Sequence, residues 1–307
     1  MLLNDEERTP HGGGECCLPK GKGSQDGIKE VSMGKKNVPD RLCKYYSDER
    51  WDDVFQRRTI RFTPPIEFND PFDSLFVVNK SHSLSEFGIM IFRYIRDKIY
   101  SKKFNIFKEV YEDREYVKKG KVNYFALDLR CNYGVFCVTE ADDNILMWSH
   151  YAESHTGFLL KNNSEFLLNY IVNKKNNYEK ISFYPVKYTE DIPYITMYKY
   201  LFDSENIFLN KHPCWKYEHE WRMFLVTFII SDEWYKNEKG EIQTGIMQIP
   251  AEAITGVVFG AKMSTEEKYK KYNELIGNDE FRHITIEHAV LDEHKYKLNV
   301  IPYIQLD

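Results

Sequence analysis

Hydrophobic and polar positions alternate with two different periods along this chain, and the periods predict where helices and strands lie. Between residues 83 and 100, apolar residues recur at helical spacing behind a capping pair formed by Ser83 and Glu86, which predicts a helix. A charged second helix is expected over 103–118. The two helices would form a hairpin inserted between strands, serving either as a lid or as a partner surface.

Shorter helical patterns occur elsewhere in the chain. Ser47 is expected to cap a short helix that carries Trp51, Val54 and Phe55 on its buried side. Further helices are expected over 142–152, 164–174, 195–209 and 264–276.

Short runs rich in β-branched and aromatic residues predict strands, most of them after Tyr133. They are expected over 59–63, 133–138, 156–160, 182–188, 221–229, 245–250, 254–260 and 283–290. Strands and helices do not alternate regularly, which argues against a doubly wound parallel sheet. The pattern predicts a mixed α+β fold with a largely antiparallel sheet core, peripheral helices and the inserted hairpin. No glycine pattern of a dinucleotide-binding turn or a P-loop is present.

Composition divides the chain into a leader and one domain. Residues 1–39 are rich in Gly, Lys and Asp and have few apolar side chains, so we expect a flexible leader. The periodic patterns then continue without another polar linker, which predicts a single domain over 41–307. Aromatic residues make up 15% of the sequence, so a pocket in this domain would suit flat ligands.

Charge and cysteine content narrow the cellular setting. The net charge of the chain is −5. Residues 93–121 nevertheless hold ten Lys or Arg against five Asp or Glu, and this local positive charge is either a solvated helix face or a site for a polyanion. None of the six cysteines forms a C-x-x-C pair, which favours free thiols in a reducing compartment. No apolar run approaches the roughly 20 residues that span a bilayer. We therefore expect a cytoplasmic protein without a membrane partner.

Four segments combine aromatic and charged residues and are the candidate chemistry. They are residues 41–46, 61–74, 146–158 and 211–222. We expect them to meet in one cleft that is reached by the side chains of Asn69, Trp148, Tyr151 and Glu220.

The last segment contains two glutamates, Glu218 and Glu220, two positions apart and followed by Arg222. If the segment is a strand, its period of two places all three side chains on one face. They would form either the rim of a reaction site or the acidic wet face of an amphipathic strand on which Arg222 neutralises the carboxylates.

The middle segments leave similar alternatives. Asn69, Asp70 and Pro71 form a turn signal that is either a plain loop or part of the site. Trp148 and Tyr151 would share a helical face, where they either present rings to a ligand or pack in the core. His150 and His155 are five positions apart, so on a helix they are poor joint metal ligands.

The ordered motifs LCKYY, FNDPFD, V-x-C-V-T-E with Cys137, ILMWSHYAESHTGF, VKY, K-x-x-x-W-x-Y-E-x-E-W-R and ITGVVFG resemble the bacterial domain of unknown function 2971 family over about residues 41–262. The motif between Tyr217 and Arg222 is also similar to the late E-x-E element of ADP-ribosyltransferases. The chain lacks their Ser-Thr-Ser stretch, and only Lys44 or Arg61 stands where they have an early His or Arg.

The second resemblance implies NAD as co-substrate and no metal. It implies that Glu220 bonds a ribose hydroxyl and stabilises positive charge while the nicotinamide bond breaks, and that Glu218 orients the acceptor. The residues expected to bind the cofactor are Lys44, Tyr45, Arg61, Asn69, Asp70, Phe72, Trp148, His150, Tyr151 and Arg222.

Three functions from different classes follow from these residues. The first is an ADP-ribosyltransferase-like toxin or antiphage effector that modifies a protein or nucleic acid and is controlled by an antitoxin or regulatory partner. The second is a Mg²⁺-dependent phosphodiesterase or nuclease with Asp70, Asp73, Glu218 and Glu220 as metal ligands. The third is a non-catalytic module that senses a nucleotide.

Overall fold

The computed structural model describes most of the chain from residue 38 onward, and all described residues belong to one compact unit, Asn37–Asp307. The described residues are 38–79, 130, 133–174, 181–196, 204–226, 234–236, 238–240 and 242–304. The expected helices over 83–100 and 103–118, and nearly all of the expected leader, lie outside these residues.

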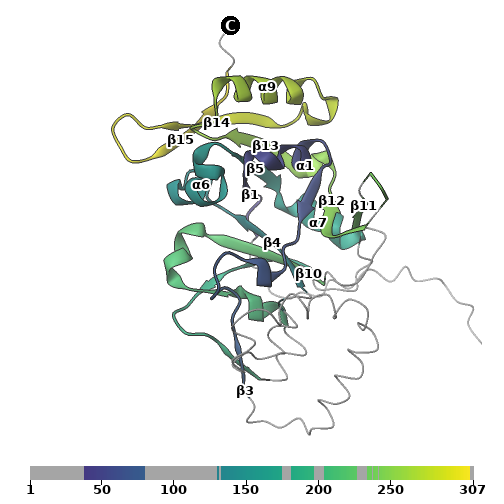
Figure 1. The fold of residues 1–307 in the computed structure, drawn as a ribbon, viewed down its shortest axis with the longest axis vertical. Coiled ribbons are helices and arrows are strands. Elements are labelled where there is room, and N and C mark those ends of the chain that lie inside the picture. Colours follow the sequence, from purple (N-terminus) through teal and green to yellow (C-terminus); the bar gives the residue numbers. More distant parts are fainter. Residues whose placement is uncertain are drawn as a thin grey trace, which may run out of the picture. The chain divides into compact units, whose positions relative to one another are not determined.

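Eight strands form one large sheet in the order β15-β14-β13-β5-β1-β4-β10-β6 (Figure 1). Among the described residues of this sheet, only β13 and β14 pair in parallel, so the structure confirms a mixed α+β fold with a largely antiparallel sheet. The strands are β1 (Arg41–Tyr46), β4 (Tyr133–Thr139), β5 (Phe158–Asn163), β6 (Phe183–Pro185), β10 (Glu220–Val226), β13 (Ile254–Phe259), β14 (Thr285–Leu291) and β15 (Leu298–Pro302).

The sheet is weakly joined between β1 and β4. β1 pairs with β5 over six residues, and β10 pairs with β4 over seven. In contrast, β1 and β4 share a single register pair, Cys43 with Thr139. The sheet therefore consists of two halves whose facing strands diverge on either side of that pair.

Hydrophobic clusters cover both faces of the half that contains β1, because successive residues in a strand point to opposite faces. On one face, Leu42 and Phe158 pack with α1 (Trp51–Phe55), α7 (Ser164–Lys174) and α9 (Thr265–Ile276). On the other face, Tyr45 and Leu159 pack with α6 (Ile145–Tyr151). The buried side of the short helix over 51–55 is thus as predicted.

Shorter elements complete the domain. The small sheets are β11-β12-β2, a parallel β3-β8 pair and a parallel β7-β9 pair. Their strands are β2 (Thr59–Arg61), β3 (Val77–Asn79), β7 (Lys187–Tyr188), β8 (Tyr194–Thr196), β9 (Asn210–Lys211), β11 (Trp234–Lys236) and β12 (Ile242–Gln248). The 3-10 helices are η1 (Asp48–Arg50), η2 (Pro65–Glu67), η3 (Glu153–His155), η4 (Ser204–Leu209), η5 (Pro213–Glu218), η6 (Ala251–Ala253) and η7 (Asp279–Phe281).

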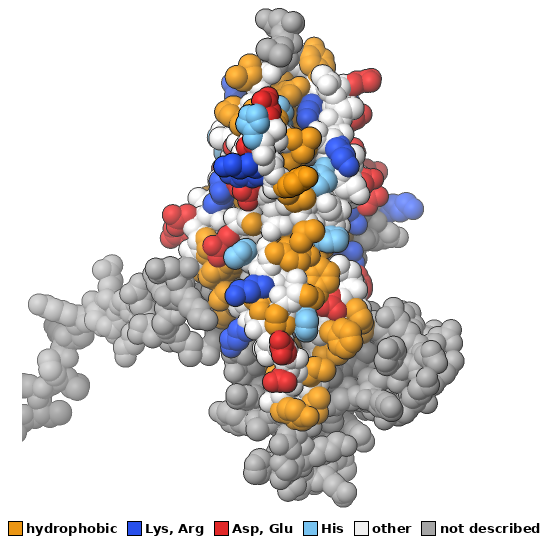
Figure 2. Space-filling model, turned by 90° about the vertical axis from the view of Figure 1, so that its left-hand side faces the viewer, with side chains coloured by type: hydrophobic (Ala, Val, Ile, Leu, Met, Phe, Trp, Pro, Cys, Tyr) orange, Lys and Arg blue, Asp and Glu red, His pale blue; other side chains and the backbone are white. Residues whose placement is uncertain are grey.

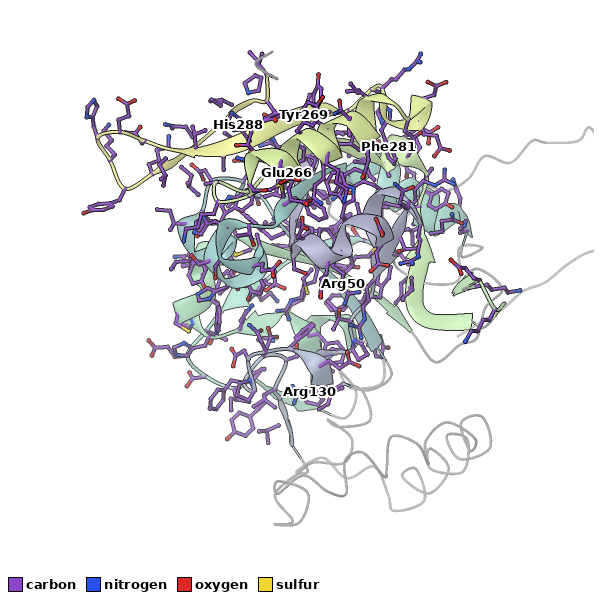
Figure 3. The ribbon with its side chains drawn as sticks, turned by 45° about the horizontal axis from the view of Figure 1, so that its top comes forward. Arg50, Arg130, Glu266, Tyr269, Phe281 and His288 are labelled. Atoms are coloured by element: carbon purple, nitrogen blue, oxygen red, sulfur yellow. The ribbon has the colours of Figure 1, made fainter. Side chains whose placement is uncertain are left out.

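Helix α9 is amphipathic and lies over the end of the sheet that contains β13 and β14. Its cap is formed by Ser264, whose Oγ accepts a hydrogen bond from the backbone of Glu267. Figure 3 shows Tyr269 on this helix, where its side chain is half exposed, while Phe281 follows in η7 and is buried against Phe55.

Two predicted elements are wrong in detail. Ser47 makes no side-chain cap, because its hydroxyl contacts the carboxylate of Glu49, and a 3-10 turn separates it from α1. The helix expected over 195–209 is wrong at both ends, because Tyr194–Thr196 is a strand and Ser204–Leu209 is a 3-10 helix, while residues 197–203 lie outside the described residues. Tyr194 and Ile195 have the β propensity that the helical pattern overlooked.

The surface on the α6 side mixes side chains of all kinds. Figure 2 shows hydrophobic, basic, acidic and histidine side chains interspersed over this face. The described residues on this face therefore form no large area of one charge sign, as a polyanion-binding surface would require.

Candidate active site

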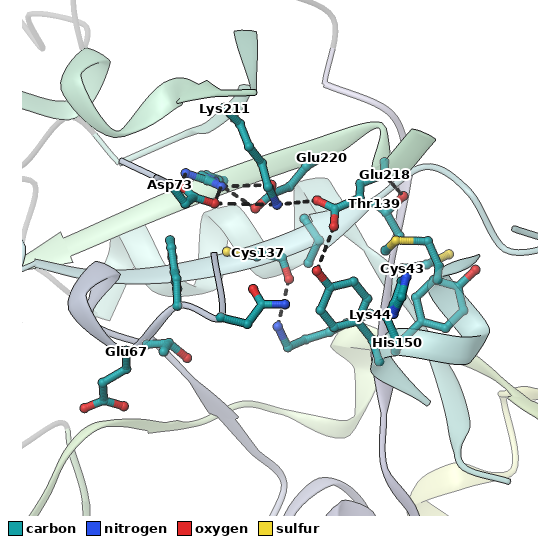
Figure 4. Close-up of a pocket in the computed structure, with 18 residues that line it drawn as sticks. Cys43, Lys44, Glu67, Asp73, Cys137, Thr139, His150, Lys211, Glu218 and Glu220 are labelled. Carbon is teal, nitrogen blue, oxygen red and sulfur yellow. Dashed lines mark hydrogen bonds and ion pairs between the residues drawn. The ribbon is translucent and has the colours of Figure 1, made fainter. Parts of the chain in front are cut away.

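A cavity of about 380 Å³ opens where β1 and β4 diverge (Figure 4). All four segments expected to meet do contribute to it. Its lining includes Lys44 and Tyr45 from the first, Phe68, Asn69 and Asp73 from the second, Met147, His150 and Tyr151 from the third, and Lys211, Glu218, Glu220 and Arg222 from the fourth. The volume is within the range of small-molecule sites.

One wall of the cavity is a cluster of buried charges centred on Lys211. The Lys211 Nζ donates to Glu218 Oε2 at 2.5 Å and to Glu220 Oε2 at 3.1 Å, and it lies 3.5 Å from Asp73 Oδ2. A single ammonium group thus bridges the two glutamates. This contact removes most of the repulsion that two neighbouring carboxylates would otherwise experience.

Arg222 binds two of these carboxylates, those of Glu220 and Asp73. Its Nε and Nη2 donate to the two oxygens of Glu220 at 2.7 and 2.9 Å, and its Nη1 and Nη2 donate to the two oxygens of Asp73 at 2.8 and 2.7 Å. Nη1 also donates to the carbonyl of Phe208 at 2.6 Å. The guanidinium therefore fixes two carboxylates in bidentate geometry.

The acidic pair does not lie on a wet strand face. Glu218 and Glu220 are only 2% and 7% exposed, and Arg222 is fully buried. Only Glu220 and Arg222 share a strand face, because Glu218 ends η5 and the intervening His219 has left-handed backbone angles, φ 44° and ψ 48°. The two glutamates converge on Lys211 through this turn, so the prediction that period-two alternation aligns all three side chains is wrong for Glu218.

The two glutamates have opposite protonation tendencies. Burial raises the pKa of Glu218, and the negative charge of Glu220 adds to this effect while Lys211 opposes it. For Glu220, burial also favours the neutral form, but Arg222 and Lys211 outweigh it and hold its pKa well below the ordinary value of 4.5. The negative charge is therefore stabilised more strongly on Glu220 than on Glu218.

Glu218 is also connected to the opposite side of the cavity. The hydroxyl of Tyr151 donates to Glu218 Oε1 at 2.7 Å, and burial raises the pKa of that hydroxyl while the Asn69 side chain opposes this effect. The backbone carbonyl of Glu218 accepts a hydrogen bond from Thr139 on β4 at 2.5 Å. Tyr151 on α6 thus orients the carboxylate of Glu218, and Thr139 on β4 fixes its backbone.

Lys44 is the cation on the β1 side of the cavity. Its Nζ donates to the carbonyl of Cys137 at 2.8 Å and lies 5.0 Å from the ring centre of Phe136. Burial lowers the pKa of Lys44, because no carboxylate contacts its ammonium among the described residues.

Four of the expected site residues do not line this cavity. Trp148 is fully buried and packs edge-on against Tyr45 in the core, so the expectation that it reaches the cleft is wrong. Arg61 lies outside the lining and pairs with Glu67 at 2.6 Å. Asp70 and Phe72 line a second cavity.

The sequence interpretation missed several lining groups. Lys211 begins the last of the four segments and precedes Glu218 by seven positions, but it was assigned no role because a single lysine carries no periodic signal. Cys137 and Thr139 also line the cavity from β4, next to Arg222 and Glu220 of the paired strand. Only the strand register brings them there.

The carboxylates considered as Mg²⁺ ligands are engaged with cationic side chains or lie apart. Lys211 and Arg222 bind Asp73, Glu218 and Glu220, and Asp70 belongs to the second cavity. Among the residues that the structure describes, no group of three His, Cys, Asp or Glu side chains is placed to hold a metal ion.

Comparison with known proteins gives one match. Residues 147–223 match the model of a family described as Protein of unknown function (DUF2971). This range contains His150, Tyr151, Lys211, Glu218 and Glu220. No curated protein and no solved structure matches the chain. In the described part of the chain, no helix combines the length and the apolar character needed to cross a membrane.

Proposed function

We propose that the cavity between β1 and β4 binds NAD and that the protein transfers ADP-ribose from it to an acceptor. The observation that carries the proposal is the acidic pair itself. Glu218 and Glu220, spaced as E-x-E, face one small-molecule-sized cavity with aromatic walls and differ in protonation tendency.

Charge balance in the cavity suits a reaction that develops positive charge. The carboxylates that line the cavity are those of Glu67, Asp73, Glu218 and Glu220, and the cationic side chains are Lys44, Lys211 and Arg222. One negative charge therefore remains when all seven groups are ionised. A buried excess of negative charge stabilises an oxocarbenium-like ribose more strongly than it would in water.

Each glutamate then has a separate task. Glu220 is held ionised and accepts a hydrogen bond from a ribose hydroxyl. The bond between ribose and nicotinamide breaks, and nicotinamide leaves with the bonding electron pair. Glu218 takes the proton of the acceptor as the acceptor bonds to the ribose carbon, consistent with its raised pKa.

Aromatic and polar side chains would position the cofactor. Tyr45, Phe68 and His150 provide ring surfaces on which the flat nicotinamide can stack. Tyr151 and Asn69 hold Glu218 in place rather than reacting.

The test is release of nicotinamide from NAD by the full-length protein, followed by chromatography. We expect release with the natural protein and a matching transfer of labelled ADP-ribose to acceptors in a cell extract. Tyr151→Phe should slow transfer by roughly tenfold, because it removes one charge-assisted hydrogen bond to Glu218. Glu252→Gln is the matched control for charge removal, since Glu252 is exposed and lies outside the cavity.

The other two functions predict different results. A metal-dependent phosphodiesterase would lose activity in chelator and would require Mg²⁺ to displace Lys211 or Arg222 from the carboxylates. A nucleotide sensor would bind NAD in calorimetry without releasing nicotinamide. Tight binding without release would refute the transferase and support the sensor.

A further inference from the structure

The second cavity, of about 460 Å³, is not used by the proposed transferase. It is formed by three segments, Asp70–Leu75, Thr189–Pro193 and Asn210–Trp215. Lys211 lines both cavities, so the two share a wall.

The charge of this cavity is acidic. Asp70, Glu190 and Asp191 line it. Lys211 contributes little positive field here, because its ammonium is already matched by Glu218, Glu220 and Asp73. A cation entering the cavity would therefore be attracted.

Asp70 provides an independent sign that a donor is missing. The residue lines the cavity and is only 7% exposed. Its Oδ1 accepts a hydrogen bond from the backbone of Phe72 at 2.9 Å, whereas its Oδ2 has no hydrogen-bond partner among the described residues. A buried carboxylate oxygen without a donor is unfavourable, and a ligand that donates to it would remove this penalty.

Aromatic rings at the same cavity favour an organic cation. Phe72 is 65% exposed, which is unusual for a phenylalanine, and Trp215 contributes a second ring. Aromatic faces attract ammonium and guanidinium groups, and neighbouring carboxylates strengthen this attraction. Among the described residues, no three His, Cys, Asp or Glu side chains are placed to hold a metal ion, so an inorganic ion is not favoured here.

We propose that this second cavity binds an alkylguanidinium or alkylammonium group, with Asp70 as the buried acceptor and Phe72 as the ring that covers the cation. The group is supplied either by a basic side chain of a peptide or by a free small amine. The site does not depend on the transferase, and it would stand if no nicotinamide were released.

Calorimetry on the full-length protein tests the proposal with charged and uncharged probes of the same shape. N-acetyl-arginine amide should bind, and N-acetyl-citrulline amide, which has the same outline without the charge, should bind at least tenfold more weakly. Agmatine and the peptide Ala-Ala-Arg-Ala-Ala separate the two sources, because the tighter binder identifies a free amine or a peptide. Affinity should fall as salt is raised, as expected for attraction between charges.

Variants test the assigned residues. Asp70→Asn keeps the acceptor for the backbone of Phe72 and removes the charge, so binding of the arginine probe should weaken by roughly tenfold or more. Asp191 is exposed, so Asp191→Asn should weaken binding of the arginine probe less than Asp70→Asn does, without affecting folding. Asp52→Asn, on the exposed side of α1, is the control and should bind normally. Equal binding of the arginine and citrulline probes, absence of binding, or unchanged affinity in Asp70→Asn would each overturn the proposal.

Discussion

Glu218 and Glu220 lie two residues apart, contact the same ammonium group and still have opposite proton affinities. The difference arises from Arg222, which binds both oxygens of Glu220 and does not bind Glu218. Whether either carboxylate acts on a ligand is therefore best tested by removing one charge at a time.

Glu220→Gln should lower the rate of nicotinamide release by about a hundredfold or more, the scale of removing one preorganised electrostatic contact. Glu218→Gln should cost less in release, because we assign it to the acceptor. The change at Glu220 also leaves Arg222 with one carboxylate fewer, so we expect the free energy of unfolding to fall by about 3 kcal/mol.

Asp73→Asn is the matched structural control for this experiment, since it removes the other carboxylate partner of Arg222. Rates are compared on protein that circular dichroism shows to be folded. A Glu220→Gln protein that is no slower than Asp73→Asn would contradict the assigned role at the ribose.

Activity should depend on the protonation of Glu218. A general base must be ionised, and the pKa of Glu218 is raised, so the transfer rate should increase with pH through a window above the ordinary value of 4.5. Kinetics between pH 4 and 9 would show this acid limb of the pH–rate profile as a rise in the transfer rate of about tenfold per pH unit. In Glu218→Gln the limb should disappear, and its persistence would assign the proton transfer to another group.

Stability has the opposite dependence at this residue. A carboxyl whose pKa is raised by folding adds stability below its unfolded pKa, and this stability is lost as pH rises through the folded value. Glu220 behaves in the reverse way: its contribution is present above pH 4.5 and is lost as pH falls toward its lowered pKa. Urea titrations of Glu218→Gln should therefore show a smaller loss of stability than the natural protein as pH rises above 4.5.

Among the elements, the corner where β5 begins relies on a close approach that only glycine allows. A side chain at Gly157 would place its Cβ 2.1 Å from the carbonyl oxygen of Tyr46 on the neighbouring strand β1. Gly157→Ala should lower the free energy of unfolding by about 3 kcal/mol, measured by urea titration. Gly240→Ala meets open space and should cost only about 1 to 2 kcal/mol for its left-handed backbone.

Sequence patterns predicted the elements that follow one regular period. The strands around Tyr133–Thr139 and Ile254–Phe259 and the helices around Ile145–Tyr151 and Thr265–Ile276 appear close to the expected ranges. Their apolar side chains repeat every two or three to four residues, and the core buries that face. Such elements can be predicted because pattern and burial agree.

Connections were harder to predict because their geometry depends on distant partners. Glu153, Ser154 and His155 all have positive φ angles, although only His has a local preference for such angles. The backbone of Lys262 donates to the carbonyl of His155, and Gly260 passes close beside it. The turn at His219, which brings Glu218 toward Lys211, is equally invisible to a periodic pattern.

The four segments that form the site could be predicted from their residue composition, but the individual side chains that line the cavity could not. Aromatic residues beside charges marked all four contributing segments, because buried charges and rings are rarely clustered without a tertiary reason. The same criterion could not separate Tyr151, which lines the cavity, from Trp148, which is buried in the core three residues earlier. It also could not identify Lys211 as the shared partner of both glutamates.

At the scale of the whole molecule, the described residues form one unit that begins at Asn37. Removing residues 1–36 should leave the melting temperature nearly unchanged, because their composition offers little apolar surface to bury and Val38, which packs against the core, is kept. Differential scanning calorimetry of the truncated and full chains measures this. A drop of several degrees would mean that the leader contributes to the folded domain.

The single register pair between β1 and β4 has a consequence for how the cavity tolerates sequence change. Where strands diverge, backbone N–H and C=O groups border the gap instead of a neighbouring strand, as the Cys137 carbonyl does when it accepts from Lys44. Every amino acid except proline carries both groups. A ligand that binds these backbone groups would tolerate most side-chain substitutions along the edges of β1 and β4. An alanine scan of the two strands would therefore leave part of the affinity for that ligand intact. Proline placed on either edge would remove a donor that no side chain can replace.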